Sequence, residues 1–115
     1  MVRIGVSNIG SFRCILDTGS FGLIIPLRII HRLHEWGLND AHFDFIGEDY
    51  AIVAGGGVVK TAEIKLREIQ IGNWSLQEVP AVVTKEGDCL LGMSILRQFG
   101  HLTIDFGNRQ LVLED

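Results

Sequence analysis

The stretch that decides the fold is Cys14-Ile15-Leu16-Asp17-Thr18-Gly19-Ser20, an apolar run followed by a short polar loop. We expect Phe12–Leu16 to form a β-strand that leads into this loop, and apolar residues resume at Leu23-Ile24-Ile25. The triplet Asp17-Thr18-Gly19 occurs once in the chain. By itself it is also compatible with an ordinary Asx turn between two strands, so its meaning depends on the segments around it.

Length and composition favour one β-rich domain. The chain has 115 residues, which fits a single domain spanning residues 1–115. Hydrophobic residues make up 47%, which is an ordinary level for a globular protein. The 14 glycines lie between short β-branched runs and there are only 2 prolines, a pattern that favours an all-β domain with tight turns.

The formal net charge is −4, from 10 Lys and Arg and 14 Asp and Glu. Basic residues are dispersed along the sequence, so we expect no basic cluster, no nucleic-acid partner and no polybasic membrane patch. No apolar stretch approaches the roughly 20 residues that span a bilayer, and the first residues lack the apolar core of a signal peptide. We therefore expect a cytoplasmic protein, unless the chain is a domain of a longer one.

Two segments have the features of short helices. Apolar residues recur at helical spacing from Leu27 to Trp36. Pro26 suits the first turn of this helix and Gly37 its C-terminal stop. A second, shorter helix is expected over Met93–Phe99.

The other segments predict strands joined by turns. Asn39–Asp49 is polar and acidic, and we expect it to be a loop with a short strand. The apolar alternation moves from even to odd positions around Arg67-Glu68, which predicts a bulge or bend there because such a shift exchanges the buried face. The expected strands are Met1–Val6, Phe12–Leu16, Tyr50–Ala54, Val58–Leu66, Trp74–Leu76, Val79–Thr84, Leu102–Phe106 and Gln110–Leu113.

The order of these segments resembles the retropepsin-like aspartic proteases, above all the cellular and bacterial single-domain members, over nearly the whole chain. The resemblance implies an all-β closed barrel with one or two short helices. It also implies a homodimer that hydrolyses peptide bonds without a metal or organic cofactor. The segments that carry it are Ile15-Leu16-Asp17-Thr18-Gly19-Ser20, Ile24-Ile25-Pro26, Ala54-Gly55-Gly56, Val79-Pro80-Ala81-Val82-Val83 and Leu90-Leu91-Gly92-Met93-Ser94-Ile95-Leu96.

The resemblance implies that Asp17 is the catalytic carboxylate and faces its copy from a second subunit. Two carboxylates about 3 Å apart cannot both ionise, so they share one proton and titrate as a coupled pair. One acts as general base on a water molecule while the protonated one polarises the scissile carbonyl. Thr18 would hydrogen-bond to the partner loop and fix the carboxylates, and Gly19 would let the backbone approach them closely.

The same resemblance implies a set of substrate-binding residues. The Ser20 hydroxyl could hydrogen-bond the outer carboxylate oxygen. The hairpin tip Ala54-Gly55-Gly56 would be a flap that opens for substrate and closes over it, with a plain flexible turn as the alternative. Ile24, Val82 and Leu90 are candidates for pocket walls, although each could equally be a core residue.

Asp105-Phe106-Gly107 has an Asp and a Gly at the spacing of the first loop. Phe106 cannot make the hydroxyl hydrogen bonds assigned to Thr18, so this segment is not expected to supply the second carboxylate. His31 and His34 lie three residues apart on the expected helix, whereas the zinc-protease motif spaces its histidines four apart. We therefore expect no metal site.

Three further expectations concern cysteines, termini and function. Cys14 and Cys89 lie in apolar runs and are expected to be free buried thiols, with a disulfide between them as the alternative. Met1–Val6 and Gln110–Leu113 are candidates for a sheet between subunits, since an unpaired terminal strand leaves an exposed edge. A non-catalytic peptide-binding or dimerisation domain of the same fold is the alternative to an enzyme, and the intact Asp17-Thr18-Gly19 favours the enzyme.

Overall fold

The computed structural model describes residues 2–17, 19–20, 22–52, 55–97, 101–105 and 110–114. None of the helices in these ranges is long and apolar enough to cross a membrane. In chain order the elements are β1 (Val2–Val6), β2 (Gly10–Leu16), β3 (Leu23–Pro26), α1 (Leu27–Glu35), β4 (Phe43–Ile52), β5 (Val58–Ile71), β6 (Trp74–Thr84), β7 (Leu90–Leu91), α2 (Met93–Leu96), β8 (His101–Asp105) and β9 (Gln110–Glu114).

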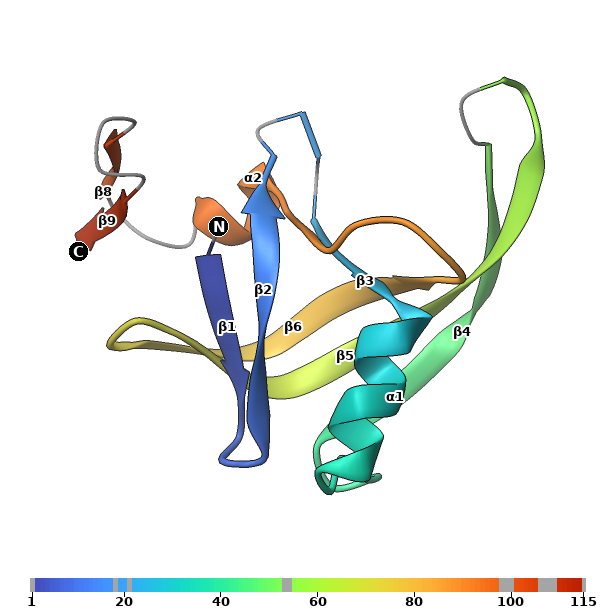
Figure 1. The fold of residues 1–115 in the computed structure, drawn as a ribbon, viewed down its shortest axis with the longest axis horizontal. Coiled ribbons are helices and arrows are strands. Elements are labelled where there is room, and N and C mark those ends of the chain that lie inside the picture. The colour runs from blue at the N-terminus through green and yellow to red at the C-terminus, as the bar shows by residue number, and fades with distance from the viewer. Residues whose placement is uncertain are drawn as a thin grey trace.

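The main sheet closes on itself. Its strand order is β1-β2-β7-β3-β6-β5-β4, and an additional pairing between β1 and β5 joins the two ends of the first six strands into a ring. β4 pairs with the outer edge of β5, and these two strands form a long hairpin that extends away from the ring (Figure 1). β8 and β9 form a separate antiparallel pair. The expected β-rich domain with short helices is confirmed.

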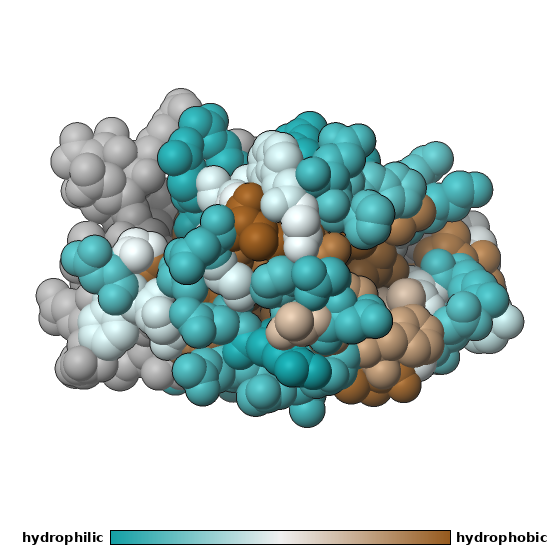
Figure 2. All heavy atoms as spheres, turned by 90° about the horizontal axis from the view of Figure 1, so that it is seen from below, coloured by the Kyte–Doolittle hydropathy of each residue, from teal (hydrophilic) through white to brown (hydrophobic). Residues whose placement is uncertain are grey.

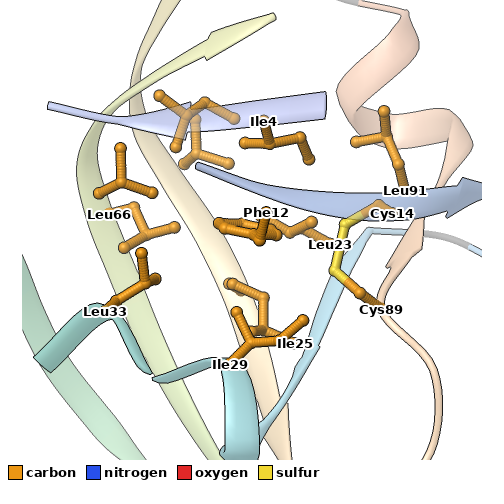
Figure 3. Packing of buried hydrophobic residues seen from close by; sticks show 14 of the residues in the cluster. Ile4, Phe12, Cys14, Leu23, Ile25, Ile29, Leu33, Leu66, Cys89 and Leu91 are labelled. Carbon is orange, nitrogen blue, oxygen red and sulfur yellow. A yellow bond between two sulfur atoms is a disulfide. The ribbon is translucent and has the colours of Figure 1, made fainter. Parts of the chain in front are cut away.

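The hydrophobic core fills the inside of the ring. Alternate residues of the strands point inward, so Ile4 in β1, Phe12 in β2 and Leu23 in β3 are buried in one cluster (Figure 3). Burial of a side chain of this size stabilises the fold by about 1.5–3 kcal/mol. The helix α1 adds Ile29 and Leu33 to the same cluster, which fixes it against the sheet.

The predicted change of buried face in β5 is present as a bend. The buried apolar residues Ile64 and Leu66 occupy even positions and Ile69 and Ile71 occupy odd ones, and the strand exchanges its partner β4 for β1 at this point. The β5–β6 pairing keeps one register across the bend, so no extra residue is inserted. Arg67 and Glu78 lie opposite each other at the bend, and Glu78 takes a positive φ of 55°.

Two expected boundaries are wrong because long-range pairing extends the strands. Within the segment expected to be a loop with a short strand, residues 43–49 all belong to the longer strand β4, and their acidic side chains contact basic side chains of β5. Arg67 bonds Asp44 at 2.9 Å, and Lys60 bonds Glu48 at 2.8 Å. β6 is one continuous strand where two shorter ones were expected. The helix from Leu27 and the terminal hairpin are confirmed, although residues 106–109 and 98–100 lie outside the described residues.

The first strand does not leave a free edge at its centre. Ile4–Val6 pairs with β2 on one side and with β5 on the other, so the expectation that this segment joins two subunits is wrong for these residues. The backbone hydrogen-bonding groups on both edges of Ile4–Val6 are already paired within one chain. β9 pairs with β8 on one side, and its role between subunits stays a prediction.

Cys14 and Cys89 form a disulfide (Figure 3), so the interpretation as free thiols is wrong. The parallel pairing of β2 with β7 sets Ile15 opposite Leu90, which brings the two preceding cysteines together with a Cα–Cα distance of 4.6 Å. The Ile15 N–H also donates to the Cys89 carbonyl at 2.8 Å. Both cysteines are buried, and the bond lies at the base of the Asp17 loop.

The end of α1 packs on the turn between β1 and β2. Trp36, directly after the helix, lies over Gly10 so closely that a Cβ at Gly10 would overlap the indole ring. We expect Gly10→Ala to lower the free energy of unfolding by about 1–3 kcal/mol because the ring must move away. Urea denaturation measures this loss.

The control for this prediction is a double-mutant cycle with Trp36→Ala. On that background the ring is absent, so Gly10→Ala should cost much less. An equal loss of stability on both backgrounds would show that the ring does not cause it.

Candidate active site

The Asp17 loop owes its position to β7, which lies between β2 and β3. β7 runs parallel to β2, with Leu16 opposite Leu91, and antiparallel to β3, with Leu23 opposite Leu91. The loop from Asp17 to Gly22 therefore crosses the end of β7 to connect its two neighbours. The Asp17 N–H donates to the Leu91 carbonyl at 3.0 Å, which continues the β2–β7 pairing into the loop.

Within the loop, backbone groups orient the carboxylate. The Gly19 N–H donates to Asp17 Oδ1 at 2.9 Å, and the Ser20 N–H donates to the Asp17 carbonyl at 3.1 Å. The side chain of Asp17 is half-buried. Oδ2 accepts no hydrogen bond from the part of the chain that the structure describes, so one carboxylate oxygen is held and the other is available.

The Ser20 hydroxyl does not make the contact expected of it. It donates to the Gly22 carbonyl at 3.4 Å, while the Gly19 N–H bonds Asp17 Oδ1 and leaves Oδ2 available. The contact of Ser20 with the outer carboxylate oxygen is therefore absent from the single chain, and its role at the site stays a prediction. Thr18 lies outside the described residues, and its contact with a partner loop stays a prediction.

Gly92 supports the loop from below, and the list of expected site residues did not include it. Its N–H donates to the Gly22 carbonyl at 3.0 Å, and the Met93 N–H donates to the Ser20 carbonyl at 3.0 Å. A Cβ at Gly92 would overlap the backbone of Ser20 and Gly22. In the sequence, Gly92 is marked only by its place directly after the apolar pair Leu90-Leu91. The fold is needed to show that it contacts the Asp17 loop.

The three expected pocket walls lie in one row across the sheet. Ile24 of β3 is opposite Val82 of β6 on one side and opposite Leu90 of β7 on the other. All three are half-buried, whereas their neighbours Leu23 and Leu91 are fully buried in the core. Because side chains alternate along strands, the row lies on the face opposite the core. These residues form an apolar strip rather than part of the core cluster.

The expected flap is the end of the β4–β5 hairpin. Gly55 and Gly56 are exposed and have φ values of 94° and 85°, a conformation that favours glycine. Ala54 lies outside the described residues. The arms of this hairpin carry large apolar side chains that the single chain leaves uncovered, with exposed fractions of 69% for Tyr50 and 80% for Ile52.

Seen from below, most of the molecular surface is hydrophilic (Figure 2). Hydrophobic residues gather toward the right of that view, the side on which Figure 1 places α1 and the β4–β5 hairpin. In the described ranges, no three His, Cys, Asp or Glu residues lie together in a way that could hold a metal ion.

A mainly β fold with a carboxylate loop around a short central strand agrees with the comparisons with known proteins. The sequence pattern of the aspartyl protease family matches residues 2–95, and the chain belongs to this family. The matched range contains the Asp17 loop, the apolar strip and Gly92.

A solved structure supports the fold. The crystal structure of a retropepsin-like aspartic protease from Rickettsia conorii superposes with a TM-score of 0.64, at 23% identity, over 90% of this chain and 74% of that chain. The retropepsin-like fold expected from the sequence is thereby confirmed. No curated protein matches the chain significantly.

We expect Gly92→Ala to lower the free energy of unfolding by about 1–3 kcal/mol or more. Gly92 has a φ of −100°, which any residue adopts, so the cost comes from the contact with the loop backbone and not from backbone strain. Chemical denaturation measures the change.

Gly47→Ala is the matched control, because a Cβ at Gly47 meets nothing within 4 Å. A loss of stability no larger than that of the control would contradict the tight contact between Gly92 and the Asp17 loop.

Proposed function

We propose that the protein is an aspartic endopeptidase that acts as a homodimer, with one Asp17 from each subunit. The observation that carries the proposal is a single Asp17-Thr18-Gly19 loop whose carboxylate is oriented by the Gly19 N–H while its second oxygen is available. Membership of the aspartyl protease family and the retropepsin-like fold support a peptidase. A reaction that needs two carboxylates then requires two chains.

In this proposal the two Asp17 carboxylates share one proton. The ionised carboxylate removes a proton from a water molecule, which attacks the carbonyl carbon of the scissile bond. The protonated carboxyl donates a hydrogen bond to the carbonyl oxygen, and a protonated carboxyl of the pair transfers its proton to the leaving nitrogen as the C–N bond breaks. The hydrogen bond from Gly19 to Oδ1 holds each carboxylate in a fixed orientation, so little rearrangement accompanies the reaction.

The substrate in this proposal is an extended peptide segment. The apolar strip of Ile24, Val82 and Leu90 offers half-buried contact area for apolar side chains beside the Asp17 loop. The β4–β5 hairpin carries exposed apolar side chains such as Ile52 and has a tip with glycines in the left-handed region. Closure of such a hairpin over a peptide would cover these side chains and exclude water.

We expect Asp17→Asn to abolish cleavage and to leave the fold and the dimer intact. The amide oxygen can still accept the Gly19 N–H, so the turn is retained while the charge is removed. A peptide-library assay measures cleavage, and sedimentation measures the dimer. Asp105→Asn is the matched control, since it changes the other Asp-x-Gly segment, and it should cleave like the unchanged protein.

Mixing the unchanged protein with Asp17→Asn protein tests the homodimer separately. After subunit exchange of equal amounts, a dimer that needs both carboxylates retains about one quarter of the activity of an equal total of unchanged protein, whereas an active monomer retains about one half. The second value, or an active species that sediments as a monomer, contradicts the shared site.

We expect a bell-shaped dependence of cleavage on pH with its maximum in the acidic range. Activity falls as pH rises because the shared proton is lost, and it falls at the lowest pH because both carboxylates become protonated. Initial rates on one peptide over a pH range of about 3 to 8 measure the profile. A rate that rises steadily through neutral pH would contradict the carboxylate pair.

The alternative is a non-catalytic domain of the same fold that binds peptides or only dimerises. The absence of pepstatin-sensitive cleavage across the acidic range, together with peptide binding that Asp17→Asn leaves unchanged, would favour it. The intact Asp17-Thr18-Gly19 loop favours the enzyme, because peptide binding alone does not require this carboxylate.

A further inference from the structure

Four arginines surround a pocket of about 300 Å³ where α1 lies beside the β1–β2 hairpin. Arg3 comes from β1, Arg13 from β2, and Arg28 and Arg32 from α1. The expectation that basic residues form no cluster is therefore wrong. The arginines are dispersed in the sequence, but the packing of α1 against the sheet brings them together.

The arrangement of these arginines is unfavourable for the protein alone. Arg3 and Arg13 are direct partners in the β1–β2 register, and like charges directly opposite each other destabilise a strand pair. Arg28 and Arg32 are four residues apart on α1, where like charges are also destabilising. Two repulsive pairs thus border the same pocket.

Among the described residues, no Asp or Glu lines the pocket or forms a salt bridge with these arginines. Salt bridges in the described ranges join Lys60 to Glu48 and Arg67 to Asp44, and neither involves a pocket residue. The first turn of α1 contains no acidic residue and Pro26 provides no side-chain cap, so the helix dipole adds further positive potential near Arg28. The four arginines thus lie together without an acidic partner in the described part of the chain, although the whole chain has a net charge of −4 and many acidic residues.

One arginine is already held in place by the backbone. Arg28 Nη1 donates to the Gly87 carbonyl at 2.6 Å, which fixes the guanidinium at the rim of the pocket. A guanidinium held in this way loses less conformational entropy when it binds an anion. The Arg28 contact therefore prepares one side of the pocket for a ligand.

The walls of the pocket combine charge with an apolar floor. Phe12 and Ile29 line it and are buried, and Ser11 adds a hydroxyl group. Planar guanidinium groups bind phosphate oxygens with two parallel hydrogen bonds, which makes arginine the preferred residue for phosphate recognition. The volume lies at the lower end of the range for small-molecule sites, so the pocket fits a small ligand with a compact anionic group and a modest organic body.

We propose that this pocket binds a small phosphorylated organic molecule. Its phosphate contacts the arginines of β1, β2 and α1, and its organic part lies on Phe12 and Ile29. A doubly charged phosphate matches four cationic groups better than a single carboxylate does, and a concave pocket suits a compact ligand better than an extended acidic peptide. The pocket shares no residue with the Asp17 loop or the apolar strip, so the inference does not rest on peptidase activity.

The test measures binding by the full chain, with no cleavage assay involved. Glucose 6-phosphate, inorganic phosphate and a glutamate-rich peptide are titrated by calorimetry at constant ionic strength. We expect saturable binding of glucose 6-phosphate at one molecule per chain, tighter than that of inorganic phosphate or of the peptide. Arg13→Gln and Arg32→Gln should each weaken it by about tenfold or more, because each removes a charge-assisted hydrogen bond.

Arg67→Gln is the matched control, since it removes the same charge from a residue that does not line the pocket, and it should change the affinity less than about twofold. In chloride buffer Arg13→Gln should melt at the same temperature as the unchanged protein or higher, because it relieves the repulsion from Arg3. Lost binding then cannot be attributed to unfolding.

Several results would overturn the proposal. These are the absence of saturable glucose 6-phosphate binding, equal weakening by Arg67→Gln, and tighter binding of the glutamate-rich peptide. Binding of inorganic phosphate as tight as that of glucose 6-phosphate would overturn the assigned organic part of the ligand.

Discussion

The fit of β7 between β2 and β3 is the constraint on which the rest of the structure depends. The two residues of β7, Leu90 and Leu91, pair with β2 on one side and with β3 on the other. They therefore fix the positions of both strands that the Asp17 loop connects. Gly92 follows β7 and contacts the loop backbone directly, so the loop and the segment after β7 can only be placed together. The disulfide between Cys14 and Cys89 joins the same two segments just before the loop begins. Rigid support on both sides keeps the carboxylate in one orientation, which a reaction between positioned groups requires.

A single chain contains only part of the proposed site. One chain orients one carboxylate and places an apolar strip beside it, but the described residues supply no second carboxylate at the loop. The β4–β5 hairpin also exposes apolar side chains that a folded single domain would normally bury. Both features suit a chain whose site is completed by something outside it. A homodimer and a bound peptide would account for both at once.

The arginine pocket is a different kind of departure from local stability. A strand pair with Arg3 opposite Arg13, next to a helix with two arginines one turn apart, is less stable than neutral residues would make it. Natural proteins break such local rules mainly at functional positions, where a ligand offsets the cost. The net charge of the whole chain is negative and so gives no indication of the arginine cluster. A net charge does not describe how charged side chains are distributed over the surface.

Local features of the sequence determined the helix from Leu27, the Asp17 loop and the change of buried face near Arg67, because apolar periodicity and turn residues act over a few positions. Contacts between segments distant in the sequence could be identified only from the tertiary structure. The strand register decided that Ile24 lies between Val82 and Leu90, and that the two cysteines meet.

Helix packing likewise decided that four dispersed arginines share a pocket, and pairing with β5 extended β4 through an acidic segment that looks like a loop. The sequence by itself shows which face of a segment is apolar. Which faces and edges meet depends on the packing of the whole core, and single-segment patterns do not contain that information.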